Sequence, residues 1–575
     1  MNDNNDYDFI VVGGGSAGCV LANRLTESGQ YRVLLLEAGP PDSHFKVKFP
    51  GGIAGLIQDH KRNWMFWTEP QRHLGNRRMY CPRGKLLGGS SAINAMCYIR
   101  GHASDYDRWA ELGATGWSFA EVLPYFRKSE TYAPGVDELH GGDGPLHVGG
   151  RVHPDNPLSL AFLHAADQAG YTFNPDLSRS APEGVGQYRV FQKDGQRHSN
   201  AEAYLRPAEH RPALTVLTGA QATRVLIGNC RATGVRYVLK GRECEARARR
   251  EVILAAGAIG SPHLLLLSGV GPRAELERHR IAQQHELPGV GENLQDHLDV
   301  WVSVRARTRV GVSFHPTFLW RAIKAMLSYL LRRRGELTSN LAEVGGFIKS
   351  SPEQPIPDIQ WHFTPAVNTS HAFKMSRSFK WYGYSVMNYF LRPYSRGRLG
   401  LASPDPLAPP AIDFNYGADV RDLQRLVQGV RKTREVLAQS AFDPHRLVEF
   451  EPGPEVRSDA ELLEWVRANA ETAYHPVGTC RMGADDMAVV DPRLRVRGIA
   501  GLRVVDASVM PTLVGGNTNA AATMIGEKGA AMVLEDQDAA ARPSAAAPVA
   551  REPSAALSRA AQPEADGVLR TTPVH

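Results

Sequence analysis

Cysteine is scarce in this chain and is not arranged for cross-linking. The 575 residues include six cysteines, and no two of them form a C-x-x-C pair. This pattern is not that of a small disulfide-rich secreted protein. We therefore expect reduced thiols and a cytoplasmic location.

Long apolar runs and a strong charge of either sign are also missing. No stretch of about 18 uninterrupted apolar residues is present, so we expect no membrane-spanning helix. The polar, acidic residues 1–6 do not fit a signal peptide. A net charge of +6 spread over 575 residues argues against a dedicated nucleic-acid-binding protein, although it is compatible with a weak preference for anionic surfaces.

Two kinds of catalytic site lack their motifs. No G-x-S-x-G follows an apolar strand, which argues against a Ser-His-Asp hydrolase. The histidines His102, His140, His147 and His297 stand at no spacing typical of metal ligands, so we predict no metal site. The hydrophobic content of 43% and the charged content of 22% are ordinary for a globular protein, and the length suggests two or more domains.

What the chain does have, close to its start, is a glycine motif between two strands. An apolar run over residues 8–12 leads into G-x-G-x-x-G at Gly13, Gly15 and Gly18, and a second apolar run ends at Glu37. This βαβ pattern predicts a dinucleotide whose pyrophosphate lies on the helix N-terminus. Glu37 is placed to accept hydrogen bonds from the adenosine ribose. The pattern alone does not separate FAD from NAD.

Further blocks follow at intervals along the chain. They are a glycine- and serine-rich segment at 84–107, an apolar strand running into 257–271, and the segments 290–297, 474–483, 504–508 and 516–520. Together with the glycine motif, these blocks resemble the signatures of the glucose–methanol–choline oxidoreductases, a family of FAD-dependent flavoproteins. The resemblance covers roughly residues 7–533.

The resemblance implies FAD as the cofactor. Ile93 stands where some relatives carry the histidine that attaches the flavin, so non-covalent FAD is expected. The implied cofactor contacts are Gly13, Gly15, Ser16, Ala17, Gly18, Glu37, Ala38, Arg83, Gly84, Leu87, Gly89, Ser90, Asn94, Ala95, Met96, Cys97, Val225, Asp506, Ala507, Asn517 and Thr518. Of these, Val225 is expected to cover the adenine, and Asp506 with Ala507 to meet the pyrophosphate and ribityl side.

The same layout implies an α/β fold with a discontinuous Rossmann-like FAD-binding domain. This domain is expected to combine residues 1–155, 215–300 and 470–535. A mixed α+β substrate-binding domain, with a mixed sheet and helices over one face, is expected from residues 156–214 and 301–469. Residues 537–575 contain almost no large apolar side chains, which predicts a disordered tail.

His475 and Asn519 are the predicted reacting groups. Oxidising an alcohol by hydride transfer requires a group that takes the hydroxyl proton, and an imidazole with an ordinary pKa of about 6.5 is suited to this. His475 lies in the block that resembles the catalytic one of the family. Asn519 is expected to donate a hydrogen bond to the developing alkoxide.

The predicted function is oxidation of a primary, aliphatic alcohol to an aldehyde, with electrons passed to a membrane or quinone-type acceptor. Residues 184–188 with 193–201, and residues 335–347, resemble the membrane-associated medium-chain alkanol dehydrogenases more than the choline dehydrogenases. A choline dehydrogenase remains an alternative, and a redox-silent cyanohydrin lyase that retains FAD is a more remote one. His475 together with Asn519 disfavours a nonenzymatic dinucleotide-binding protein.

Residues 318–331 form an amphipathic pattern. Leu319, Ile323, Met326, Leu327 and Leu330 fall on one helical face, and three arginines follow at 332–334. One interpretation is a helix that lies on an anionic membrane, at the inner face of the cell membrane. The other is a helix whose apolar face packs over the substrate pocket.

Overall fold

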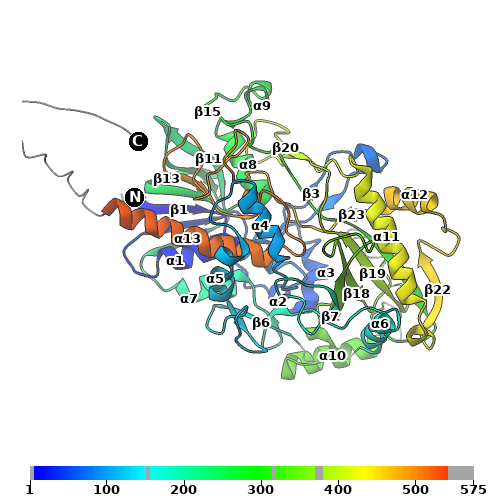
Figure 1. Ribbon diagram of the computed structural model, residues 1–575. Coiled ribbons are helices and arrows are strands. Elements are labelled where there is room, and N and C mark those ends of the chain that lie inside the picture. The colour runs from blue at the N-terminus through cyan, green and yellow to red at the C-terminus, as the bar shows by residue number, and fades with distance from the viewer. Residues whose placement is uncertain (1–5, 151–155, 314–318, 369–379, 542–575) are drawn as a thin grey trace, which may run out of the picture. The chain divides into compact units, whose positions relative to one another are not determined.

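The computed structural model describes residues 6–150, 156–313, 319–368 and 380–541 (Figure 1). The chain divides into a compact unit, Met1–Val533, and a short C-terminal unit, Leu534–His575. Helix α13 (Asn519–Ala541) ends within the second unit. The predicted tail therefore does not begin at 537, and its remainder, 542–575, lies outside the described residues.

The first of two large sheets carries the glycine motif. Its strand order is β10-β2-β1-β13-β12-β11, and β24 pairs with β13. The strands are β1 (Asp6–Val12), β2 (Val33–Glu37), β10 (Leu214–Thr218), β11 (Ala220–Gly228), β12 (Arg231–Leu239), β13 (Arg242–Leu254) and β24 (Leu502–Val504). The pairs among β10, β2, β1, β13 and β24 are parallel, whereas β11, β12 and β13 pair antiparallel. Buried parallel strands account for the continuous apolar runs in β1 and β2.

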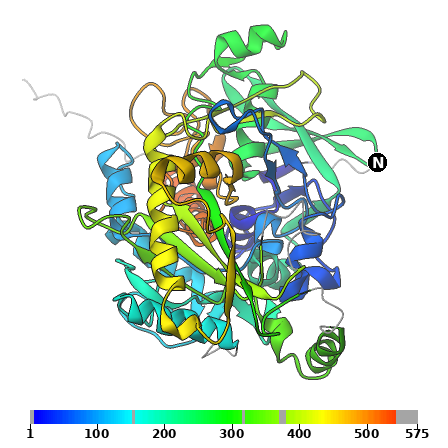
Figure 2. The same cartoon turned by 90° about the vertical axis from the view of Figure 1, so that its right-hand side faces the viewer.

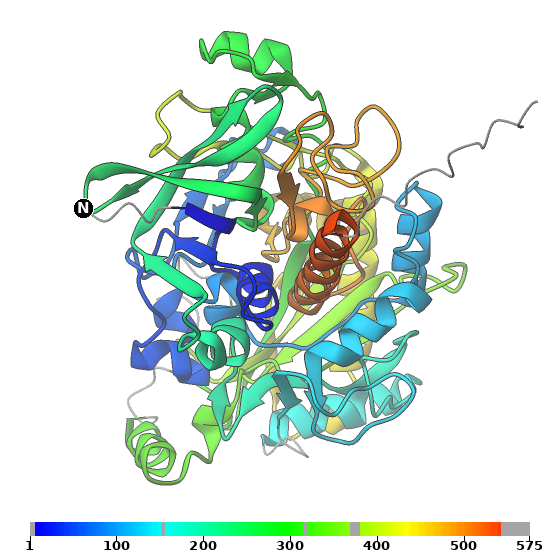
Figure 3. The same cartoon turned by 90° about the vertical axis from the view of Figure 1, so that its left-hand side faces the viewer.

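Helices α1 (Ser16–Leu25) and α13 pack closely beside this sheet, and Figure 3 shows them side by side. Their contact requires a glycine, because a Cβ at Gly526 would lie 3.0 Å from the Cα of Ala17. An ion pair between the partly buried Arg24 and the buried Glu527 (2.7 Å) joins the same two helices. Helix α1, which follows the glycine turn, is thereby held against α13.

The second large sheet has the order β22-β16-β19-β18-β17-β7, with β23 beside β16. Its strands are β7 (Gly184–Gln187), β16 (Leu298–Ala306), β17 (Val344–Ile348), β18 (Ile359–Thr364), β19 (Gly383–Phe390), β22 (Arg446–Glu451) and β23 (Glu471–Thr472). Helices α6 (Pro157–Gln168), α11 (Val420–Leu437) and α12 (Asp459–Asn469) are associated with it, and Figure 2 shows α11 crossing its strands. Every pair of these strands is antiparallel, so the predicted mixed sheet is wrong in this respect.

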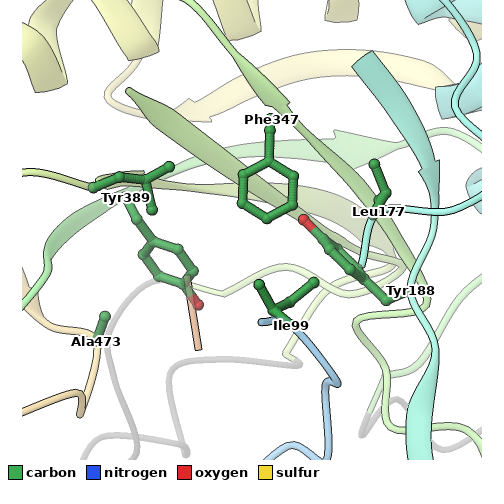
Figure 4. Packing of buried hydrophobic residues seen from close by; sticks show 7 residues of the cluster. Ile99, Leu177, Tyr188, Phe347, Tyr389 and Ala473 are labelled. Atoms are coloured by element: carbon green, nitrogen blue, oxygen red, sulfur yellow. The ribbon is translucent and has the colours of Figure 1, made fainter. Parts of the chain in front are cut away.

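Strand alternation gives the second sheet two different faces. In β18, Trp361 and Phe363 contact Phe162 of helix α6. The alternate residues His362 and Thr364 line a cavity on the other face. Beside that cavity, Tyr188, Phe347, Tyr389 and other buried apolar side chains gather around Ile99 (Figure 4).

Shorter elements connect these layers. They are α2 (Phe45–Lys48), α3 (Ile53–Leu56), β3 (Phe66–Trp67), β4 (Tyr80–Cys81), α4 (Ala103–Glu111), α5 (Phe119–Ser129), β5 (Glu130–Tyr132), β6 (Leu146–Gly149), β8 (Val190–Lys193), β9 (Gln196–Arg197), α7 (Arg206–Ala208), α8 (Gly257–Leu267), β14 (Val270–Gly271), α9 (Arg273–Arg278), β15 (His285–Glu286), α10 (Leu319–Arg332), β20 (Arg398–Gly400) and β21 (Ala411–Asp413). The predicted α/β fold class is confirmed by the two sheets and their helices. The proposed residue boundaries between the two domains stay a prediction.

Helix α10 forms where the amphipathic pattern predicted it. It is fixed through Tyr329, which is buried and packs its ring against Phe49 at a centroid distance of 5.1 Å. Its predicted apolar face is open: Ile323 is 42% exposed, Leu327 54% and Leu330 59%. The interpretation of these side chains as a cover of the substrate pocket is therefore wrong.

Candidate functional site

A large cavity lies at the glycine motif and extends to the inner face of the second sheet. Its volume is ≈ 1000 Å³, and its wall includes residues of β2, the 83–97 loop, β18, β19 and the segments 473–476 and 506–519. This volume is at the upper end of the range for small-molecule sites, roughly 300–1,000 Å³. An extended ligand of dinucleotide size fits such a space.

The glycine motif shapes one end of the cavity with backbone alone. A Cβ at Gly18 would lie 1.8 Å from the carbonyl oxygen of Gly13, so the first turn of α1 can approach the strand only with glycine there. Around Gly15 the nearest atom beyond the chain neighbours would lie 3.8 Å from such a Cβ. Gly15 is also the N-cap of α1 and offers no side-chain cap. The N–H groups at the start of α1 are thus available to an anionic group.

Glu37 lies at the end of β2 and lines the same end of the cavity. Its carboxylate accepts hydrogen bonds from the backbone N–H groups of Gly14 (2.9 Å) and Gly39 (2.8 Å). Burial raises the pKa of this carboxyl to about 7. The carboxylate therefore braces both adjoining turns, and its contact with a ribose stays a prediction.

The glycine- and serine-rich loop packs directly onto the glycine motif. A Cβ at Gly89 would lie 2.7 Å from the Cα of Gly15, so this contact is between two backbones. Arg83 anchors the loop by donating to the hydroxyl of Ser90 (3.1 Å) and to the carbonyl oxygen of Tyr474 (2.8 Å). The loop thereby connects the first strand to the segment that carries His475.

Most of the predicted cofactor residues meet at this cavity. The predicted residues that line it are Gly13, Gly15, Ser16, Ala17, Glu37, Ala38, Arg83, Gly84, Gly89, Ser90, Asn94, Ala95, Met96, Cys97, Asp506, Ala507, Asn517 and Thr518. Asp506 lies at the start of α8, where it accepts hydrogen bonds from the hydroxyl of Ser261 (2.5 Å) and the N–H of Gly257 (2.9 Å). These glycines, free helix N–H groups and polar side chains fit FAD.

Gly18, Leu87 and Val225 are not part of the cavity wall. Gly18 serves the packing of the turn, and Leu87 is buried beside Gly14. Val225 is buried within β11, where its N–H donates to the hydroxyl of Ser268 (2.8 Å). The part of β11 that does reach the cavity is 220–222. The expected contact between Val225 and an adenine is therefore not supported by this geometry.

His475 lies at the other end of the cavity wall, between three polar partners. Its backbone N–H donates to the carboxylate of Asp296 (2.6 Å). Its Nδ1 is 3.0 Å from Nδ1 of His297, and its Nε2 is 3.1 Å from the side-chain nitrogen of Asn517. Burial, assisted by the nearby His297 and Arg83, lowers the pKa of His475 well below 6.5. The imidazole is therefore neutral near pH 7.

Asn517, and not Asn519, is the asparagine that contacts His475. The side-chain oxygen of Asn519 accepts a hydrogen bond from the Ser16 hydroxyl (2.6 Å), and its nitrogen points to Asn200 at 3.5 Å. The expected pair of His475 with Asn519 is thus replaced by His475 with Asn517. The physical reason is the start of α13 at Asn519, which turns this side chain toward α1. Both asparagines belong to one short block and both line the cavity.

Two further histidines belong to the site and were not predicted from the sequence as site residues. His297 is fully buried behind His475. His362 lines the cavity, stacks on Tyr188 at a centroid distance of 4.5 Å, and has its Nε2 2.9 Å from the side-chain nitrogen of Gln360. Burial lowers the pKa of each to about 3. The only local signal was the position of His297 directly after Asp296 in the 290–297 block.

The cavity wall includes the apolar and aromatic residues Trp301, Leu341, Met387 and Tyr389, together with polar residues such as Asn340 and His362. The ring of Tyr389 lies 6.0 Å from that of His475. The acidic residues among the described lining are Glu37, Glu69 and Asp506, and Glu69 pairs with Arg78 at 3.5 Å. Within the described parts of the chain, no group of three His, Cys, Asp or Glu side chains is arranged to hold a metal ion.

Two protein-family models match the chain, and both belong to the same family. The N-terminal model of the GMC oxidoreductases matches residues 7–299, and the C-terminal model of the same family matches residues 393–526. The two matches together contain the glycine motif, the 83–97 loop, His475 and both asparagines.

Two relatives illustrate the similarity. The chain is 46% identical over 539 residues to an "Alcohol dehydrogenase [acceptor]" of Pseudomonas putida, covering 93% of this chain and 97% of the relative. It is 47% identical over 531 residues to an "Oxygen-dependent choline dehydrogenase" of Pseudomonas putida (strain GB-1), covering 91% and 93%. Sequence identity alone does not separate the two activities.

Solved structures share the fold over nearly the whole chain. Pyridoxine 4-oxidase from Mesorbium loti superimposes with a TM-score of 0.83 at 30% identity, covering 92% of this chain and 99% of that one. A variant of formate oxidase from Aspergillus oryzae gives a TM-score of 0.87 at 28% identity, covering 94% and 100%.

Proposed function

Because the chain belongs to the GMC oxidoreductases, an FAD-dependent family, we propose that it oxidises an uncharged primary alcohol to an aldehyde. The observation that carries this proposal is the neutral His475 beside Asn517 at the wall of a cavity that fits FAD. The family and the oxidoreductase activity rest on the comparisons. The alcohol, the reacting residues and the acceptor are the proposal.

The chemistry follows from what each side chain can hold. Bound FAD supplies the hydride acceptor. His475 accepts the hydroxyl proton of the alcohol at Nε2, because a neutral imidazole has a lone pair on one nitrogen. Asn517 donates a hydrogen bond to the same oxygen as its negative charge develops. The two nitrogens lie 3.1 Å apart, so one oxygen atom can contact both.

We propose that FAD is held without a covalent bond. Ile93 lines the cavity, and the resemblance puts it where some relatives carry the histidine that attaches the flavin. Its side chain has no nucleophile. Acid precipitation of the purified protein is expected to release the flavin into the supernatant. Yellow flavin retained in the protein pellet would contradict this expectation.

The apolar part of the cavity wall favours an aliphatic alcohol. Trp301, Leu341 and Met387 offer apolar contact to a hydrocarbon chain. Aromatic rings can hold a quaternary ammonium group, and a carboxylate beside them would balance its charge. Among the described lining, Glu37 and Asp506 are engaged with backbone N–H groups at the cofactor end, and Glu69 is engaged with Arg78.

One observation favours choline as a second candidate. Asp299 of β16 is fully buried and pairs in register with Tyr389, whose ring lines the cavity. The carboxylate is close enough to contribute to a raised pKa of Tyr389, which burial raises most. A cation that reached this ring would lie near both an aromatic face and a negative charge.

Anaerobic flavin absorbance distinguishes these substrates. The purified holoenzyme is titrated with 1-octanol and, separately, with choline, and bleaching of the flavin is recorded. Bleaching by octanol at lower concentration is the expected result. Bleaching by choline alone would replace the aliphatic alcohol with choline, and bleaching by no alcohol would favour the lyase alternative.

We further propose that α10 binds the surface of an anionic membrane, where an apolar alcohol and a quinone-type acceptor are concentrated. Besides the open face described above, Trp320 is 79% exposed and Leu331 80% exposed. Lys324 and the arginines at 332–334 are exposed beside them. Among the described helices none is long and apolar enough to cross a bilayer. Apolar contact combined with positive charge is typical of a helix that lies in the interface.

Vesicle sedimentation tests this surface. The triple variant Ile323→Ser, Leu327→Ser, Leu330→Ser is expected to lose at least roughly tenfold in partition to phosphatidylcholine vesicles containing phosphatidylglycerol, because three apolar contacts are lost. The matched control is Leu447→Ser, Val448→Ser, Phe450→Ser on β22, whose side chains are 52%, 40% and 39% exposed. Equal partition of the α10 variant and the native chain would overturn the proposal, and equal binding to pure phosphatidylcholine would remove its electrostatic part.

A further inference from the structure

His297 and His475 form a direct contact between two buried imidazoles. Their Nδ1 atoms are 3.0 Å apart, and their rings are nearly perpendicular at 82°. On its other side, Nε2 of His297 is 3.1 Å from the carbonyl oxygen of Leu391. His297 is therefore engaged at both nitrogens, and one of them faces the proposed base.

The chemistry of these atoms determines where the protons are. A carbonyl oxygen only accepts, so Nε2 of His297 must carry hydrogen and donate to Leu391. His297 is neutral, because burial lowers its pKa to about 3. Its Nδ1 therefore has a lone pair and accepts. The hydrogen between the two rings then belongs to Nδ1 of His475.

This arrangement leaves the lone pair of His475 on Nε2. That nitrogen faces the side-chain nitrogen of Asn517, which is a donor, at 3.1 Å. The donor and acceptor pattern is thus consistent from Leu391 through both histidines to Asn517. The opposite tautomer of His475 would place two lone pairs against each other at the contact with His297.

We propose that His297 is a positioning residue that fixes the tautomer and ring orientation of His475, so that the lone pair is on Nε2, the nitrogen beside Asn517. The inference rests on the proposed role of His475 and adds the residue that prepares it. The neighbouring Asp296 holds the backbone N–H of His475 (2.6 Å). Two consecutive residues thus hold the base, one by its main chain and the other by its ring.

A neutral partner has a different effect from a carboxylate at the same place. A carboxylate would favour the charged imidazolium and raise the pKa of His475. An imidazole acceptor orients the ring without adding negative charge. The base therefore stays neutral and ready to accept a proton while its orientation is fixed.

Two substitutions separate positioning from general packing. His297→Leu removes the acceptor, and we expect kcat to fall by on the order of 100-fold with little change in KM, since one tautomer and orientation are no longer favoured. His297→Gln has a side-chain oxygen that can accept from His475 and a nitrogen that can donate to Leu391. It is expected to recover most of kcat. FAD content, measured by absorbance, reports whether each variant keeps its fold.

The outcomes are decided by comparison with His475→Ala. In the His475→Ala background, adding His297→Leu is expected to change kcat by less than about twofold, because a positioning residue acts only through the base. Near-normal kcat of His297→Leu, equal losses for the Leu and Gln variants, or additive losses in the double variant would each overturn the inference. Near-normal kcat of His475→Ala would instead overturn the proposed function itself.

Discussion

The two ends of the cavity are built in different ways. The cofactor side, 13–18 with 83–97, presents glycine backbone and helix N–H groups whose spacing is set within a few residues. The reacting side presents His475 and its partners His297 and Asn517, and the two histidines are 178 residues apart in the chain. A site made of backbone is specified by local sequence, whereas a site made of side chains depends on how distant segments fold together.

The largest expected effect is a loss of kcat that affects the reacting side and leaves the cofactor side intact. His475→Ala removes the proton acceptor, and we expect kcat to fall by about 10²- to 10⁴-fold. The cofactor side is untouched, so the flavin content should equal that of the native holoenzyme. Steady-state kinetics with the best alcohol, together with flavin absorbance, measure both quantities, and turnover within a few fold of native would contradict the assigned role.

The next effect contrasts two asparagines of one block. Asn517→Ala removes the donor beside His475 and is expected to lower kcat by about 10²- to 10³-fold. Asn519→Ala is the matched control, because its amide contacts Ser16 and Asn200 and not the base. With FAD saturated, the control should keep kcat within a few fold. A larger loss in kcat for the control would instead assign to Asn519 the hydrogen bond to the developing alkoxide.

A smaller effect is expected on the cofactor side. At Gly89, where φ is +52°, a Cβ would collide with Gly15, so Gly89→Ala should weaken FAD binding by roughly tenfold or more through strain. Gly29→Ala is the control, since φ there is +73° but no atom lies within 4 Å of the added Cβ. Fluorescence titration of the apoprotein with FAD measures both affinities. Equal affinities of the two variants would show that the backbone contact does not shape the cofactor side.

The smallest expected effect concerns pH: kcat/KM should not change over the neutral range. A base acts in its neutral form, and the pKa of His475 is lowered well below 6.5 by burial. Loss of activity on acidification therefore begins only as the pH falls through that lowered pKa. We expect kcat/KM to be level from pH 8 through 6.5, and a decline centred near 6.5 would show that His475 has an ordinary pKa in the holoenzyme.

Much of the cofactor side could be predicted from the sequence. The strand, the glycine turn and Glu37 follow from apolar runs and spacing, which are local properties. His475 was identified through its resemblance block, and the structure places it on the cavity wall. Helix α10 could also be predicted, because the spacing of its apolar residues is a property of one continuous segment.

The remaining parts of the site could not be predicted, because they depend on the direction of side chains and on contacts between segments that are far apart in the chain. Asn517 lies just before α13 and Asn519 is its first residue. The amide of Asn517 therefore contacts His475, whereas that of Asn519 contacts Ser16. Val225 lies in a strand whose register places 220–222 at the cavity instead. His297 gains its partner only when β16 and the 473–476 segment come together.

Helices α1 and α13 both begin at the cavity, and the hydrogen bond from Ser16 to Asn519 ties their first residues together. Each helix start carries about half of an elementary positive charge from aligned peptide dipoles, so the pair supplies about one. This charge has no proton to lose and is unaffected by pH. Negative charge at either helix start is therefore stabilised by the backbone itself, in a way that does not change with pH.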